Sequence, residues 1–317
     1  MENEIKPKVS VCVVCYNQEK YIAQCLQSLV DQVTDFPFEI IVSDDASTDT
    51  TPQIVQEFAN EYPVTIKAFL QPKNLGPAGN YKFAHMQASG DYIAHLDGDD
   101  LARPGKLQAQ ANALDKNPHC VMSTHNSYII DSEGKPSTKL HGNYQDGIYD
   151  LNDLLARLPF FAHSSKMVRS SINKESLSII QPETIDIELH VFMAKIGDII
   201  HLALPLGEYR SGVGMSTAIK NSVHPALPRA TARIFDNILI TARKNERRTI
   251  EKKYANAFLQ FAYQAAMAGN QQQIKEFSKE SIVIRFYSLT QLIFLLTPVQ
   301  ILIFLAKKRR LARYKTE

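Results

Sequence analysis

The first third of the chain alternates short apolar runs with segments whose apolar residues recur at helical spacing. Continuous apolar runs are typical of strands that are buried on both faces of a parallel sheet. Apolar residues three and four positions apart form one face of an amphipathic helix. Strands are predicted at 9–15, 38–43, 64–70 and 92–96. Helices are predicted at 22–30, 51–62, 77–88 and 104–114.

This alternation predicts an α/β fold, in which a doubly wound, mostly parallel sheet is flanked by helices. In such sheets ligands bind beyond the carboxyl ends of the strands. Polar residues follow three of the predicted strands, as Tyr16-Asn17, Asp44-Asp45 and 97–100. Asp and Asn are also common in loops and caps, but three clusters at strand ends favour a binding site.

Beyond residue 115 the pattern is looser. Residues 121–130 and the turn at 131–134 predict a β-hairpin or an edge strand. Helices are predicted at 151–158 and 182–196. Residues 229–269 are basic and are predicted to form a helical pair.

Charge is distributed unevenly along the chain. From Arg229 to the end there are 17 Lys and Arg against 6 Asp and Glu, whereas 1–228 has 18 against 27. Residues 286–306 carry no charge, contain Pro298, and are followed by the basic residues 307–310. This tail predicts a helix or hairpin broken at the proline that lies on an anionic membrane surface. The alternative is an apolar helix that packs on the protein or on a second subunit, as in a homo-oligomer.

Nucleic acid is not an expected partner, because the basic region lacks an aromatic stacking platform and a recognised motif. The four cysteines, Cys12, Cys15, Cys25 and Cys120, do not form two CxxC pairs, so a zinc site of that kind is not expected. Free cysteines and a polar start without a signal peptide's apolar stretch predict a cytoplasmic protein.

The segment Asp97-Gly98-Asp99 offers two carboxylates at the end of a predicted strand. Hard divalent cations such as Mn²⁺ or Mg²⁺ prefer oxygen ligands and often use one or two carboxylates together with substrate phosphates. The remaining ligands of an EF-hand are missing, and neither a GxGxxG nor a Walker lysine motif is present. The segment therefore favours a metal-assisted phosphate site rather than a dinucleotide or ATP site.

Four ordered motifs, at 9–17, 39–49, 74–76 and 90–100, together resemble the family-2 glycosyltransferases, which have the GT-A fold. The resemblance is dense over about the first 115 residues and continues more thinly to Ser216. It implies an inverting enzyme that transfers a sugar from a nucleotide donor, of which a UDP-sugar is expected. The expected acceptor is a hydroxyl of a glycan or of a lipid-linked saccharide.

The resemblance also implies roles for individual residues. Asp45 is expected to accept the N3–H of a uracil base, and Asp97 to face the ribose and diphosphate. Asp99, with Asp97, is expected to hold Mn²⁺ or Mg²⁺. The expected donor-binding residues are Cys15, Tyr16, Asn17, Glu19, Asp44, Asp45, Asn74, Gly76, Asn80, Asp97, Gly98 and Arg210.

An inverting transfer needs one carboxylate to take the proton of the acceptor hydroxyl. The resemblance implies that Asp186 is this base; Glu188 is a second candidate, and Asp186 can also cap a helix. Many family members carry a histidine two residues after the arginine, where this chain has Gly212, which puts a contact from that side chain in doubt. The resemblance implies that His163 lies in a segment near the acceptor, but a lone histidine is more often structural, and His163 is interpreted in that way.

The expected organisation is a catalytic domain at 1–222, with a nucleotide-binding half at 1–115 and an acceptor half at 116–222. A basic helical extension is expected at 223–285, and the membrane-associating segment at 286–317. The enzyme would then act peripherally on the cytosolic face of a membrane. A second hypothesis is a pseudoenzyme or scaffold that binds a sugar nucleotide there without turnover; the intact Asp97, Asp99 and Asp186 argue against it.

Overall fold

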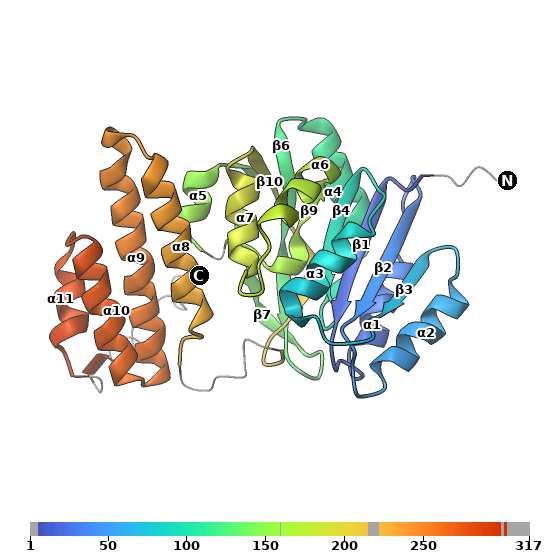
Figure 1. Ribbon diagram of the computed structural model, residues 1–317, viewed down its shortest axis with the longest axis horizontal. Coiled ribbons are helices and arrows are strands. Elements are labelled where there is room, and N and C mark those ends of the chain that lie inside the picture. The colour runs from blue at the N-terminus through green and yellow to red at the C-terminus, as the bar shows by residue number, and fades with distance from the viewer. Residues whose placement is uncertain (1–5, 159, 215–221, 299–300, 303–317) are drawn as a thin grey trace. The chain divides into compact units, whose positions relative to one another are not determined.

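The computed structural model describes residues 6–158, 160–214, 222–298 and 301–302. Two compact units make up the chain (Figure 1). The first comprises Met1–Leu154 and Pro159–Val213, and the second comprises Leu155–Leu158 and Gly214–Glu317.

A mixed sheet is the framework of the first unit. Its strands are β1 (Val9–Cys15), β2 (Phe38–Asp44), β3 (Ile66–Leu70), β4 (Tyr92–Asp97), β5 (Leu101–Ala102), β6 (Cys120–Ile130), β7 (Pro136–His141), β8 (Gly147–Tyr149), β9 (Met167–Arg169) and β10 (Asp198–Arg210). The order across the sheet is β3-β2-β1-β4-β9-β6-β10-β5, while β7 pairs with β6 and β8 with β10. The α/β architecture with a mostly parallel first half is therefore confirmed.

Helices lie on both faces of this sheet (Figure 1). They are α1 (Ile22–Val30), α2 (Thr51–Glu61), α3 (Gly76–Met86), α4 (Lys106–Lys116), α5 (Leu151–Ala156), the 3₁₀ turn η1 (His163–Ser165), α6 (Ser170–Ser176), the 3₁₀ turn η2 (Leu177–Ile179) and α7 (Asp186–Ala194). The main core lies between β1, β2, β4 and the helices α1 and α4, and Val11, Val13, Leu26 and Leu107 are buried in it.

The register of the central strands decides where the site forms. Strand β1 runs parallel to β2 and to β4, and it pairs Cys15 with Asp44 and Val14 with Asp97. The carboxyl ends of these three strands therefore meet at one edge of the sheet. The polar clusters that follow them are brought together as expected.

Several predicted boundaries were wrong. Strand β3 begins at Ile66 rather than 64, because Tyr62 accepts hydrogen bonds from Thr65 and Ile66 in a turn that leaves Val64 exposed. Helix α7 begins at Asp186 rather than 182, because residues 181–184 form a turn. Strand β6 does form a hairpin with β7, but it also pairs with β9 and β10 and so is not an edge strand.

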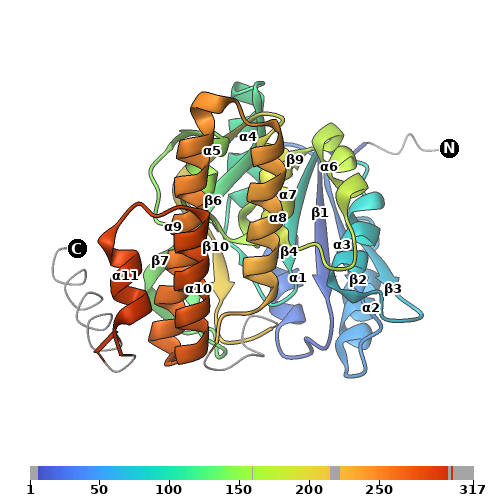
Figure 2. The same cartoon turned by 60° about the vertical axis from the view of Figure 1, so that its left-hand side comes forward.

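The second unit is helical, with α8 (Ala226–Thr241), α9 (Lys244–Ala268), α10 (Gln271–Ile284) and α11 (Leu289–Leu296). Helices α9 and α10 pack side by side in both views (Figures 1 and 2), and Phe258, Phe261 and Phe277 interlock between them. Helices α8 and α9 are the basic helical pair predicted at 229–269. Among the described residues, no helix has the length and apolar character needed to cross a membrane. Residues 299–300 and 303–317 of the predicted membrane segment lie outside the described part.

Candidate active site

The loops after β1 and β2 hold each other through hydrogen bonds between side chain and backbone. Asn17, in the left-handed region with φ of 51°, accepts from the Thr48 backbone N–H at 2.8 Å. Its own N–H donates to Ser47 Oγ at 2.8 Å, and that hydroxyl donates to Asp44. Asn17 and Asp44 therefore hold the loops after β1 and β2 against each other.

Glu19 and Tyr16 lie at the outer rim of the same region. The Glu19 carboxylate accepts from the N–H and the hydroxyl of Thr50, just before α2. The Tyr16 ring is 48% exposed, while Cys15 is buried with its thiol against the Ser43 carbonyl. An exposed aromatic ring at a strand end can stack on a base, whereas Cys15 can only support the strand.

Asp45, Asn74 and Gly76 form a second group. Asp45 Oδ1 accepts from the Leu75 N–H at 2.6 Å, and Asn74 Nδ2 donates to the Asp45 carbonyl at 3.0 Å. Gly76, at φ of 76°, donates its N–H to Asn74 Oδ1. Burial raises the pKa of Asp45 above its ordinary value, so this carboxylate lies in a partly dehydrated environment. Asn80 lies beneath, where its amide bonds the carbonyl and hydroxyl of Ser43.

The turn after β4 carries the paired carboxylates. Asp97 Oδ2 accepts from Ser164 Oγ at 3.2 Å, and Asp97 Oδ1 lies 3.1 Å from His95 Nε2. Burial and the neighbouring Asp97 charge raise the pKa of Asp99 to about 6. The carboxylate oxygens of Asp97 and Asp99 are donors of the kind that a hard cation prefers, so these residues fit Mn²⁺ or Mg²⁺.

Gly98 is required in this turn by close packing. A Cβ at this position would lie 2.3 Å from Gln18 Oε1 and 2.9 Å from Cys15 Cβ. The Cys15 atom belongs to a buried strand and cannot move away. Gly98 therefore lets this turn sit directly on the end of β1.

Arg210, the last residue of β10, forms hydrogen bonds with the turn at 97–100, here called the carboxylate turn, and holds it in position. Its Nε donates to the Asp99 carbonyl at 2.9 Å, and its backbone N–H donates to Asp100 Oδ1 at 2.8 Å. The guanidinium also donates to the carbonyls of Asp131 and Ser132 and to Gln24 Oε1, and it is almost fully buried. The structure thus gives Arg210 a positioning role, and its contact with a diphosphate remains a prediction.

Asp186 is the first residue of α7, and its carboxylate accepts the Ile187 N–H at 2.9 Å. Burial raises the pKa of Asp186, the Lys166 ammonium lowers it, and the Asp97 charge raises it further. Asp186 therefore lies within the electrostatic field of the carboxylate turn. Glu188, the second base candidate, accepts from the Ile185 N–H at 3.1 Å and so closes the cap of the same helix.

A cluster of histidines next to Asp97, buried except for the half-buried His163, was missed by sequence reasoning. His85 Nδ1 lies 2.7 Å from Asn173 Oδ1, His85 Nε2 lies 3.1 Å from His95 Nδ1, and His95 Nε2 contacts Asp97. One available signal was the i, i+2 spacing of His95 and Asp97, which places both on the same face of β4. The members of the cluster are His85, His95, His163, His190 and Lys166.

The hydrogen bonds that link His95, His85 and Asn173 all have the same direction, with each donor pointing toward Asn173. Asn173 Nδ2 donates to the His85 carbonyl, so Asn173 Oδ1 must accept from His85 Nδ1. Burial lowers the pKa of His85 well below its ordinary value, so His85 is neutral and its Nε2 accepts from His95 Nδ1. Burial lowers the pKa of His95 to about 4, so His95 is neutral as well, and its Nε2 lies 3.1 Å from Asp97 Oδ1.

Lys166 is completely buried in the centre of the cluster. Its ammonium lies 3.0 Å from both ring nitrogens of His163 and 4.8 Å from the centre of the Tyr81 ring. Burial lowers its pKa to about 7, while the charges of Asp97 and Asp186 oppose that shift. Lys166 is thus a buried amine, protonated below a pH of about 7, whose charge interacts with those of Asp97 and Asp186.

Comparison with known proteins agrees with this fold and with these motifs. Residues 10–177, more than half of the chain, match Glycosyl transferase family 2, and the chain belongs to this family. Its class is therefore that of the glycosyltransferases.

Two relatives indicate the range of similarity. An uncharacterised protein of Mycobacterium tuberculosis is 33% identical over 204 residues, which are 64% of this chain and 58% of that protein's length. Poly(ribitol-phosphate) beta-N-acetylglucosaminyltransferase TarS of Staphylococcus aureus is 30% identical over 172 residues, 53% of this chain and 29% of TarS. The match to these relatives thus spans less than two thirds of their length.

Solved structures share the fold. The structure of S. aureus TarS 1–349 in complex with UDP-GlcNAc gives a TM-score of 0.65 at 21% identity, with 96% of this chain and 92% of that chain covered. The mannosyltransferase PcManGT of Pyrobaculum calidifontis, in complex with GDP-Man and Mn²⁺, gives 0.57 at 16% identity, covering 95% and 84%.

Proposed function

We propose that the protein is an inverting, metal-dependent glycosyltransferase that moves a sugar from a UDP-sugar to a hydroxyl of a glycan or a lipid-linked saccharide. One observation carries the proposal: the strand register places Asp97 beside the ends of β1 and β2, and its partner His95 packs against His163, which lies within 4.8 Å of Asp186. These contacts support a single site that would hold the donor groups and the base candidate. Residues 1–222 would form the catalytic domain.

The donor would bind at the ends of β1 and β2. The Asp45 carboxylate is suited to accept the N3–H of uracil, because a buried carboxylate forms strong hydrogen bonds with such donors. Tyr16, Asn17 and Glu19 would line the nucleoside pocket. TarS was crystallised with UDP and with UDP-GlcNAc, which supports a uridine nucleotide here.

Asp97 and Asp99 would hold Mn²⁺ or Mg²⁺ against the diphosphate. When bound, the cation neutralises the charge that develops on the leaving nucleotide. Arg210 keeps the turn in place through the Asp99 carbonyl. PcManGT, whose structure contains Mn²⁺, supports a metal of this type.

Asp186 would take the proton of the acceptor hydroxyl as that oxygen bonds the anomeric carbon. The bond between this carbon and the diphosphate breaks in the same step, so the configuration inverts. The half-buried position of Asp186 and its raised pKa make it a stronger base than an exposed carboxylate. Glu188 is less suited, because it caps α7.

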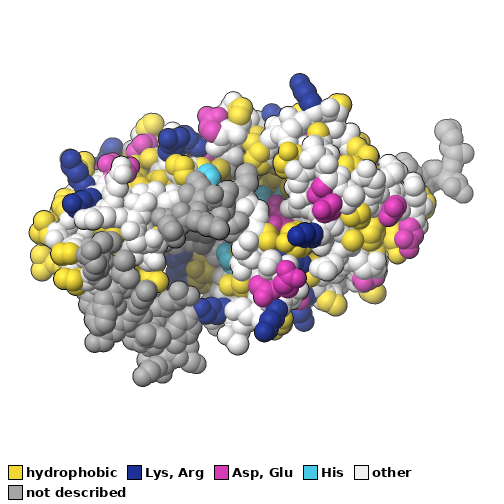
Figure 3. All heavy atoms as spheres, turned by 90° about the horizontal axis from the view of Figure 1, so that it is seen from below, with side chains coloured by type: hydrophobic (Ala, Val, Ile, Leu, Met, Phe, Trp, Pro, Cys, Tyr) yellow, Lys and Arg dark blue, Asp and Glu magenta, His cyan; other side chains and the backbone are white. Residues whose placement is uncertain are grey.

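Membrane association would place the enzyme next to a lipid-linked acceptor on the cytosolic face. Leu289, Ile293 and Leu296 recur on one side of α11 and are exposed, two of them by 70% and 75%. In Figure 3, exposed hydrophobic side chains gather at the left-hand end, near Lys and Arg side chains. The basic residues 307–310 follow in the sequence and would attract anionic lipid. Co-sedimentation with anionic vesicles, and its loss in Leu289→Glu/Leu296→Glu, tests this part.

The central experiment measures binding and turnover of UDP-, GDP- and TDP-sugars with Mn²⁺ or Mg²⁺. We expect metal-dependent binding of a UDP-sugar that is lost in Asp99→Ala. Asp186→Asn should bind the donor but transfer sugar about 10²–10⁴-fold more slowly. Glu188→Gln is the matched control and should retain turnover. Donor binding by wild type without any transfer would favour the pseudoenzyme, and absence of binding by folded protein would refute the proposal.

A further inference from the structure

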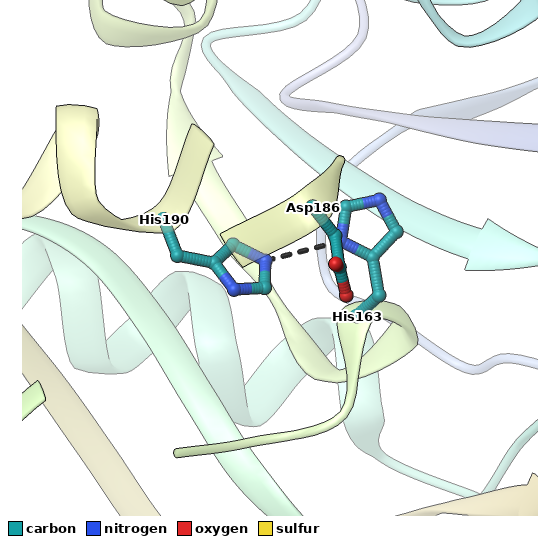
Figure 4. A group of neighbouring side chains, drawn as sticks. All are labelled: His163, Asp186 and His190. Atoms are coloured by element: carbon teal, nitrogen blue, oxygen red, sulfur yellow. Dashed lines mark hydrogen bonds between the residues drawn. The ribbon is translucent and has the colours of Figure 1, made fainter. Parts of the chain in front are cut away.

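His163, Asp186 and His190 lie close together between η1 and α7 (Figure 4). Asp186 and His190 are four residues apart on α7, so they project from the same side of the helix. His163 reaches them from η1, and His163 Nδ1 lies 3.0 Å from His190 Nε2. One ligand atom of each residue lies within 4.8 Å of those of the other two.

We propose that these three residues form a binding site for a borderline divalent transition-metal ion of the Zn²⁺ class, separate from the Asp97–Asp99 site. Two imidazoles and one carboxylate are a ligand set that zinc commonly uses, with a fourth position left open. A pair of ligands spaced i, i+4 on a helix is a frequent way to present two of them.

The spacing is close to what such an ion requires. With Zn–N distances of about 2.0–2.1 Å, two tetrahedral ligand atoms lie about 3.3 Å apart. The two imidazole nitrogens, at 3.0 Å, are near this separation without a metal. The carboxylate needs only a side-chain rotation to join them, since it lies within 4.8 Å. Asp186 and His163 are half-buried rather than enclosed, so an ion can reach the site from the Asp186 side.

The ligand chemistry separates this site from the carboxylate turn. Mg²⁺ prefers an all-oxygen shell, and imidazole suits Zn²⁺ and Co²⁺. An excess of Mg²⁺ would therefore saturate Asp97 and Asp99 and leave the imidazoles available. The two sites can be observed independently in one sample.

Lys166 opposes the ion. Its ammonium lies 3.0 Å from the ring nitrogens of His163, so a second cation on this ring would experience repulsion. The site should thus bind more weakly than three such ligands without a neighbouring cation. Lys166→Met removes the charge, keeps much of the volume, and should tighten binding.

A consequence for activity rests on the proposed function. An ion bound to the Asp186 carboxylate would occupy the lone pair that is needed to take the acceptor proton. Zn²⁺ would then inhibit sugar transfer in the presence of saturating Mg²⁺, while donor binding would persist.

The test uses the full chain in excess Mg²⁺, with Zn²⁺ affinity measured against a chromophoric chelator and Co²⁺ followed by its visible absorption. We expect one equivalent bound with a tetrahedral Co²⁺ spectrum. His190→Ala and the isosteric Asp186→Asn should each weaken binding by about tenfold or more. Asp99→Ala is the control and should bind Zn²⁺ as wild type does, and Lys166→Met should bind it more tightly.

Unchanged affinity in Asp186→Asn, or a loss in Asp99→Ala, would overturn the proposal. Weaker binding in Lys166→Met would also overturn it, because Lys166 would then be a ligand. Thermal unfolding shows whether each variant is folded. If His190→Ala does not fold, the result for Asp186→Asn is the deciding one. If the protein binds Zn²⁺ as expected but transfers no sugar, the proposed zinc site is supported and only the proposed enzymatic function is refuted.

Discussion

The donor loops and the histidine cluster are two polar regions of the same unit built in different ways. In the donor loops, Asn17 and Glu19 bond backbone groups and hydroxyls of neighbouring loops near the surface. In the cluster, His85, His95 and Lys166 are buried and are satisfied mainly by other side chains. The first region contributes a shaped surface for a ligand, whereas the second contributes a fixed electrostatic background.

This difference has energetic consequences. A hydrogen bond near the surface can be replaced by water, so its loss has a small effect on folding. A buried polar group that loses its partner retains the full desolvation penalty. Substitutions in the cluster should therefore lower stability, and substitutions in the donor loops should mainly weaken donor binding.

The largest expected effect is that of His95→Leu. It removes the partner of the buried His85 Nε2 and one partner of Asp97, whose side chain is 36% exposed. We expect the free energy of unfolding in urea to fall by about 1–3 kcal/mol for the orphaned His85, and by less for Asp97, which water can reach. His119, an exposed histidine, is the control, and His119→Leu should change stability by less than about 0.5 kcal/mol. Equal losses of stability in the two variants would contradict the claim that the buried cluster contributes more to stability than an exposed histidine.

Gly98→Ala should destabilise the protein by about 1–3 kcal/mol, because the added Cβ meets Cys15 and Gln18. It should also displace Asp97 and Asp99 and so lower metal-dependent donor binding. The matched control is Gly147→Ala, where the nearest atom to a new Cβ is 3.4 Å away. Chemical unfolding and donor titration measure both effects, and a stable variant that binds donor normally would contradict the close-packing argument.

Lys166 predicts a dependence of stability on pH. Burial lowers its pKa from 10.5 to about 7, so between these values the unfolded chain binds the proton that the folded chain has released. Stability should therefore rise with pH between about 7 and 10, by at most about 1.4 kcal/mol per pH unit for one proton. Lys166→Met should lack this contribution. If the free energies of unfolding of wild type and Lys166→Met, measured in urea, change with pH in the same way from pH 7 to 9.5, the prediction is contradicted.

Ser47→Ala should give the smallest change in stability, about 1 kcal/mol, since Ser47 links Asn17 to Asp44 in a partly exposed loop. Its effect should appear instead in the dissociation constant of the nucleotide sugar, which should rise. Calorimetric titration measures that constant. A loss of stability as large as that of His95→Leu would remove the contrast between the two regions.

The same contrast explains what the sequence could predict. The strand ends were predictable, because apolar runs followed by Asp, Asn and Gly are local patterns and parallel strands bring them to one edge. The histidine cluster was not, because His85, His163 and His190 come from separate segments and each lies within an ordinary helix or turn. The start of α7 was misplaced because the turn at 181–184 depends on a local bond of Thr184. The roles of individual site residues came from the family resemblance rather than from the local pattern.

Arg210 also has a consequence for the order of events during synthesis. The residue that braces the carboxylate turn is separated from Asp99 by 111 positions, and it ends the last strand of the sheet. A nascent chain that has released only residues up to Asp100 from the ribosome would contain every carboxylate proposed for the donor site but would lack the Arg210 contact to their turn. The ability to bind donor should therefore arise late, after β10 has emerged and paired with β6, and premature capture of nucleotide sugar by unfinished chains would be avoided.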